Sequence, residues 1–155
     1  MDDFLAPVRD YVDYVLSPDR LGESEDTKLV RLARLLDRLA VHAEFTNDGP
    51  ADVDIDDGPD DTQMLYQTMN GHFPELGHYS TVLDIDPLKA QNNIAVGDAI
   101  DDLADIAADL LAVVRVAELS DAAAAKQEFN FRFRTHWGFH LRELQQYIFC
   151  RLRGF

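Results

Sequence analysis

The sequence predicts an all-α protein, an irregular helical bundle of about five helices that ends in a long antiparallel helical hairpin. Apolar residues recur at three- and four-residue spacings in several segments, which is the pattern of amphipathic helices. No segment shows the convincing alternation of apolar and polar residues that marks a half-buried strand. Because the 155 residues, 46 % of them hydrophobic, suffice for one core, we expect a single domain over residues 1–155.

Three helices are expected in the first half of the chain. Residues 3–16 place valines and aromatic residues on one face, and Ser17-Pro18 ends this helix because the residue before a proline disfavours helical geometry. Residues 26–44 form a second helix with a stripe of leucines and outward-facing arginines. Residues 61–70 form a short third helix that stops near a glycine and a proline.

Two segments have the composition of loops. Residues 46–61 contain glycine, proline and seven aspartates with little to bury, so we expect a mobile acidic loop there. Residues 71–94 are expected to be irregular, with a brief helix near residues 87–91.

The last two helices form the predicted hairpin. Residues 95–118 show the clearest amphipathic pattern of the chain, and Ser120 or Asp121 can cap a final helix that reaches about Leu152. The short break between these long helices predicts an antiparallel pair.

The charge of the chain excludes some classes of partner. A net charge of −15 repels nucleic acid phosphates and anionic lipids, so we expect neither as a partner. Residues 121–155 nevertheless carry six basic and three acidic side chains, which indicates complementary packing within the molecule. No segment approaches the ~20 apolar residues that span a bilayer. An acidic N-terminus and a single cysteine add to the expectation of a bacterial cytoplasmic protein.

Carboxylates and histidines gather on the two helices of the hairpin. At 100° per residue, four aspartates of the first helix fall within about 60° of one another, with Asp101 beside them. In the hairpin, His136 lies level with Asp105, and His140 lies level with Asp101. The candidate functional cluster comprises Asp98, Asp101, Asp102, Asp105, His136 and His140. A divalent metal, the one cofactor that the sequence indicates, would be held by Asp101, Asp105, His136 and His140, because an i, i+4 histidine pair can chelate a metal from one helix face.

Two plainer interpretations of this cluster stay open. Aspartates opposite an apolar stripe usually form the solvated face of a helix, where some would pair with Arg132 and Arg134. Histidines beside Trp137 can also be hydrogen-bonded residues at the edge of the core.

Aromatic residues of the last helix point in several directions. Phe131 and Phe149 point roughly opposite Trp137, and Phe139 takes a third direction. Either this helix is central to the bundle, or its spare face packs against another chain. The sequence therefore favours a small non-catalytic protein that associates with itself or with a protein partner through Phe131, Phe139 and Phe149. The alternative is a metal-dependent hydrolase that acts on a phosphorylated small molecule, so whether the chain is an enzyme stays open.

Two segments carry a family resemblance. The aspartate-rich stretch from Gly97 to Ile106 and the aromatic-histidine stretch from Phe129 to His140 resemble a bacterial family known as domain of unknown function 5063. A weaker match lies in residues 73–79, and together the matches cover most of residues 64–145. The resemblance implies a helical fold and no particular activity, substrate or cofactor.

Overall fold

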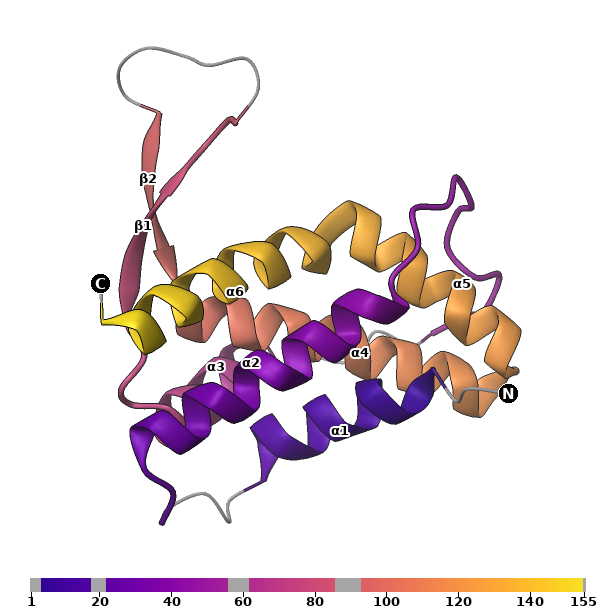
Figure 1. The fold of residues 1–155 in the computed structure, drawn as a ribbon. Helices are drawn as coiled ribbons and strands as arrows, with labels where there is room; N and C mark the ends of the chain where they lie inside the picture. The colour runs from indigo at the N-terminus through magenta and orange to yellow at the C-terminus, as the bar shows by residue number, and fades with distance from the viewer. Residues whose placement is uncertain (1–3, 18–21, 56–61, 86–92, 155) are drawn as a thin grey trace.

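The long helix α4 (Ala99–Leu119) is surrounded by most of the other helices in the computed structural model, which describes residues 4–17, 22–55, 62–85 and 93–154 (Figure 1). The other helices are α1 (Leu5–Leu16), α2 (Glu25–His42), α3 (Thr62–His72), α5 (Ala122–Arg132) and α6 (Gly138–Arg153). The predicted all-α bundle is therefore confirmed. The five main helices expected from the sequence lie within a few residues of their predicted ends, although the last of them, expected to reach about Leu152, is divided into α5 and α6.

Helices α1 and α2 close one side of the core. The valines and leucines of their predicted apolar stripes are buried. The buried hydroxyl of Tyr11 in α1 donates a hydrogen bond to the carbonyl oxygen of Leu103 in α4. Helix α2 begins at a capped end, because the side chain of Ser24 accepts a hydrogen bond from the backbone N–H of Thr27.

The C-terminal hairpin is also confirmed, with an interruption that the sequence does not reveal. The carboxylate of Asp121 caps α5, and a π-helical turn, η2 (Phe133–Trp137), joins α5 to α6. A Cβ atom at Gly138 would overlap the carbonyl oxygen and the ring of Phe133, so this wide turn requires a glycine. π-helical turns within α-helices frequently occur at functional sites.

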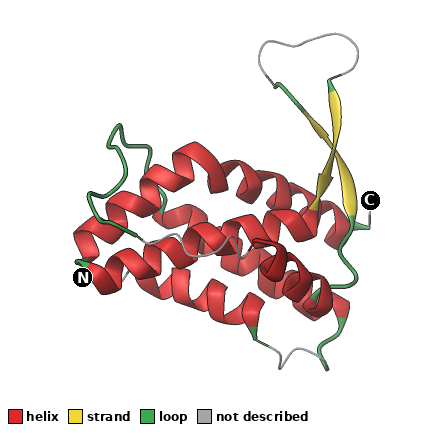
Figure 2. Cartoon of the chain, turned by 180° about the vertical axis from the view of Figure 1, so that it is seen from behind, coloured by secondary structure: helices red, strands yellow, loops and turns green. Residues whose placement is uncertain are grey.

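A two-stranded hairpin contradicts the expectation that the chain contains no strand. Strand β1 (His78–Val82) pairs antiparallel with β2 (Ile94–Asp98), and the hairpin projects from one end of the bundle (Figures 1 and 2). The strands escaped prediction because Ile94 and Val96 face solvent instead of the core, so apolar residues do not mark a buried face. The helix expected over residues 95–118 begins instead at Ala99, where the carboxylate of Asp98 caps it.

The described part of the acidic loop is tied to the last helices. The backbone N–H of Ala51 donates to Glu128, and the amide of Gln127 donates to the carbonyl oxygens of Gly49 and Pro50. Residues 56–61 of that loop and the brief helix expected near residues 87–91 lie outside the described residues, so the mobility of the loop stays a prediction. Within the described ranges, no helix combines the length and the apolar character needed to cross a bilayer.

Candidate functional site

Two histidines and three aspartates meet where the π-helical turn faces α4. His136 belongs to η2 and His140 to α6, and their ring centroids lie 4.9 Å apart. The Nδ1 atom of His136 lies 2.8 Å from Oδ2 of Asp109, and that of His140 lies 2.8 Å from Oδ1 of Asp102. The Nε2 atom of His140 also lies 3.3 Å from Oδ2 of Asp105. Each histidine therefore contacts α4 through its Nδ1 atom, and Asp105 lies beside the pair.

Two of these aspartates are buried rather than solvated. Asp102 is 4 % exposed and Asp109 is 6 % exposed. The guanidinium of Arg132 donates to Asp109 at 2.9 Å and to the buried carboxylate of Glu128 at 2.5 Å. Arg132 thus pairs with one aspartate of α4, as expected, whereas Arg134 donates to the carbonyl oxygen of Asp48 and not to α4. The alternative of a wholly solvated aspartate face is wrong for Asp102 and Asp109.

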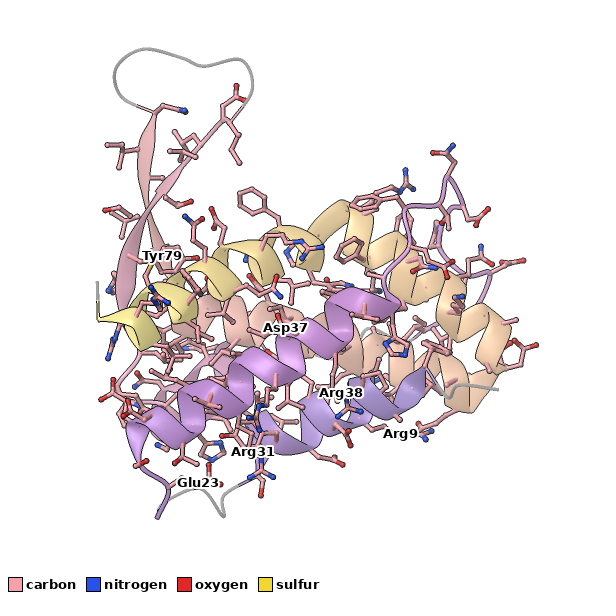
Figure 3. All side chains as sticks on the ribbon, viewed as in Figure 1. Arg9, Glu23, Arg31, Asp37, Arg38 and Tyr79 are labelled. Atoms are coloured by element: carbon pink, nitrogen blue, oxygen red, sulfur yellow. The ribbon has the colours of Figure 1, made fainter. Side chains whose placement is uncertain are left out.

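The base of the β-hairpin completes the site. Figure 3 shows Tyr79 at this base, next to α6, and its hydroxyl donates a short hydrogen bond to Asp102. The same hydroxyl lies 3.3 Å from Oε2 of Glu143, whose other oxygen accepts a short hydrogen bond from Thr81. Gly97, the cross-strand partner of Tyr79, leaves room for the tyrosine ring, because a Cβ atom there would overlap it.

The electrostatic environment changes the proton affinities of three of these groups. The hydrogen bond to Asp102 raises the pKa of His140, and the carboxylates of Asp105 and Asp101 add to this increase against the opposing effect of burial. Burial raises the pKa of Asp105, although the two nearby histidines oppose this. Burial, together with the hydrogen bond to Asp102, raises the pKa of Tyr79 well above its usual range, so this hydroxyl keeps its proton.

The structure brings together most of the residues that the sequence singled out. Asp105, His136 and His140 each offer one ligand atom, and these atoms lie within 4.8 Å of one another. Asp101 is exposed and stands outside this trio in the described structure. Asp98 instead accepts hydrogen bonds from the backbone N–H of Ile100 and from the hydroxyl of Tyr66, as a helix cap does.

Sequence reasoning did not place Tyr79 in the site, and it left Asp109 out of the candidate cluster. Asp109 shares the helix face of Asp102 and Asp105, so its spacing was a usable signal. Tyr79 comes from a strand that the sequence pattern concealed, and no spacing in the sequence connects it to α4.

The predicted interaction surface is only partly exposed. Phe139 is 58 % exposed and Phe149 is 60 % exposed, whereas Phe131 is half-buried under the guanidinium of Arg134. Helix α6 thus presents two mostly exposed aromatic side chains that do not belong to the hydrophobic core of the described residues.

These features define an all-α bundle whose C-terminal hairpin carries a histidine–aspartate cluster. The chain belongs to the family described as "Domain of unknown function (DUF5063)", whose family model matches residues 2–149 and so includes every residue of the cluster. The resemblance seen in the sequence is thereby confirmed. Neither the curated proteins nor the solved structures provide a match to this chain.

Proposed function

We propose that this protein binds a divalent transition metal through His136, His140 and Asp105. Two imidazole nitrogens and one carboxylate oxygen form a ligand set that suits zinc, manganese or iron(II). The ligand atoms already lie within 4.8 Å of one another, so a metal could join them with small side-chain movements. The side chain of His136 is half exposed, which gives an ion access from solvent.

The observation that carries this proposal is the pair of buried carboxylates behind the histidines. A histidine that binds a metal usually donates its other ring N–H to a carboxylate or carbonyl oxygen, which fixes the tautomer and the ring orientation. Asp109 and Asp102 occupy this position at 2.8 Å from each Nδ1 atom. Nδ1 then carries the proton, and Nε2 keeps the lone pair that a metal requires.

Three protein ligands favour a reactive centre over a structural one. Structural zinc sites are usually closed by four protein ligands, whereas catalytic sites keep a position for water or substrate. A metal-bound water is a hydrolytic nucleophile near neutral pH. We therefore propose metal-dependent hydrolysis as the class of reaction. For a phosphorylated substrate, the metal would have to supply the positive charge, because Arg132 is already engaged by Glu128 and Asp109.

Thermal melting of tag-free protein tests the proposal. After removal of metal with EDTA, we expect zinc, manganese or iron(II) to raise the unfolding midpoint more than magnesium or calcium does. A metal at about 100 times its dissociation constant adds roughly 2.7 kcal/mol to the free energy of unfolding, which corresponds to a rise of about 5–10 °C for a domain of this size. His136→Ala should abolish the rise.

His78→Ala provides the matched control, because His78 is exposed and lies near Asp98, which is not one of the proposed metal ligands. This variant should keep the full response to metal. A response that survives in His136→Ala, or the absence of any response to the three transition metals, would contradict the proposed site.

A second candidate function is self-association through α6, and the exposure of Phe139 and Phe149 favours it. We expect sedimentation at rising protein concentration to show a dimer that the double variant Phe139→Ser, Phe149→Ser converts to a monomer. Val41→Ser, which alters an exposed side chain on α2, should leave the dimer intact. A wild-type protein that stays monomeric over the whole concentration range would contradict this function.

A further inference from the structure

A small cavity lies between β1 and residues 143–151 of α6. Its volume is about 260 Å³, and its lining includes Tyr79, Thr81, Glu143, Gln146, Tyr147 and Arg151. The rings of Tyr79 and Tyr147 are stacked with centroids 5.0 Å apart and form an aromatic part of the wall. Because ligand pockets for drug-sized molecules measure roughly 300–1,000 Å³, this cavity suits a smaller molecule.

The charged groups of this wall are not balanced. Glu143 accepts hydrogen bonds from two neutral hydroxyls, those of Tyr79 and Thr81. Among the described residues, no lysine, arginine or histidine side chain forms an ion pair with Glu143. The negative charge of Glu143 on the cavity wall therefore has no counter-ion among the described residues.

The positive group on the same wall is already neutralised. Arg151 forms a short ion pair with Glu25 and donates to the carbonyl oxygen of Glu75 at 3.2 Å and to the hydroxyl of Tyr147 at 3.0 Å. Among the described residues that line the cavity, an anionic ligand would thus find no free cation, and it would face the carboxylate of Glu143.

We propose that this cavity binds a small organic cation, an alkylammonium group, with Glu143 as its counter-ion. The ammonium would donate to the carboxylate, and its carbon chain would make apolar contact with the rings of Tyr79 and Tyr147. The net charge of −15 raises the local concentration of cations around the protein. This site does not depend on a metal at His136 and His140.

The cavity and the histidine cluster nevertheless share one residue. The hydroxyl of Tyr79 lies between Glu143 and Asp102, and Asp102 in turn holds His140. An ammonium group bound at Glu143 would therefore lie next to the hydrogen-bonded chain that orients a proposed metal ligand. An amine-bearing molecule bound in this cavity would therefore lie beside the proposed metal site at His136, His140 and Asp105.

An NMR titration of ¹⁵N-labelled protein, in EDTA and physiological salt, tests the site. The probes are butylamine, 1-butanol and butyrate, which differ little in size and present a cation, a neutral group and an anion. Butylamine should give saturable amide shifts confined to β1 and residues 143–151, and the other two probes should not. Equal shifts from 1-butanol would overturn the proposal, because they would show a merely apolar cavity.

A pair of charge-removing variants completes the test. Glu143→Gln should weaken butylamine binding by at least about tenfold, because it removes a charge-assisted hydrogen bond. Glu118→Gln, which removes an exposed carboxylate from α4, should leave the affinity unchanged. Equal losses in both variants would overturn the site in favour of general attraction to an acidic surface. The comparison of the three probes uses the wild-type protein, so it stays decisive if Glu143→Gln fails to fold, and the EDTA separates it from any result at the metal site.

Discussion

Replacement of Arg132 by methionine is expected to lower the free energy of unfolding by about 3–5 kcal/mol, the cost of leaving buried charges without their partner. The guanidinium of Arg132 lies between two buried carboxylates, Glu128 at 2.5 Å and Asp109 at 2.9 Å. Methionine replaces the aliphatic part of the arginine side chain and lacks only the guanidinium, so most of the loss reports the missing charge and its hydrogen bonds. Burial lowers the pKa of Arg132, but the hydrogen bonds to both carboxylates outweigh this and raise it, which keeps the cation charged.

Chemical denaturation of metal-free protein measures this loss. Arg38→Met is the control, because Arg38 forms an equally short ion pair with Asp10, at 2.6 Å, but both side chains are about half exposed. Figure 3 shows Arg38 at the outer contact of α2 with α1. Exposed pairs contribute only ~0–1 kcal/mol. Similar losses in the two variants would mean that burial does not distinguish these pairs.

The helices could be predicted because their signals are local. A stripe of leucines in residues 26–44, or of alanine, isoleucine and leucine in residues 95–118, records which face is buried without knowledge of the partner. The sequence of the β-hairpin carries no such signal. Its inner face meets α6 through only a few side chains, chiefly Tyr79 and Thr81, while Ile94 and Val96 remain in solvent. A strand whose apolar residues face water does not show the alternation by which strands are found.

The candidate site was likewise predictable only where its signal is local. Helical spacing together with the antiparallel hairpin was enough to bring His136, His140 and Asp105 near one another. Which aspartate each histidine bonds depends on rotation about both helix axes, and the π-helical turn changes that rotation for every residue after Phe133. The sequence placed His140 level with Asp101, whereas the structure pairs it with Asp102, on the buried side of the same helix turn. The burial of Asp102 and Asp109 follows from this packing and not from their spacing.

Replacement of Asp102 by asparagine is expected to weaken zinc binding by about 10–100-fold, the usual effect of removing a group that orients a metal ligand. Asp102 accepts hydrogen bonds from Nδ1 of His140 and from the hydroxyl of Tyr79, one on each carboxylate oxygen. Asparagine has one acceptor oxygen and an amide that only donates, so one of these contacts must be lost. The ring of His140 would then be less firmly held, and its nitrogen less basic.

Competition with a chromophoric chelator measures the affinity, and Asp101→Asn is the control. Asp101 neighbours Asp102 and bears the same charge, but it is exposed and lies outside the ligand cluster. If Asp102 acts through its hydrogen bond to His140, Asp101→Asn should change the affinity by less than about threefold, as expected for an exposed charge. Equal losses of zinc affinity in the two variants would show that the aspartates act only through the long-range electrostatic effect of their charges.

The titration of His140 separates this orienting role from a general loss of structure. The hydrogen bond that His140 donates to Asp102 is the largest cause of the raised pKa of His140, so Asp102→Asn should lower that pKa, as followed by NMR of the imidazole protons. A lower pKa alone would favour metal binding in mild acid, because fewer protons would compete for the imidazole. The affinities are therefore compared at alkaline pH, where His140 is neutral in both proteins and the expected loss reflects orientation. A variant that keeps both the raised pKa and the zinc affinity would remove Asp102 from the proposed metal centre.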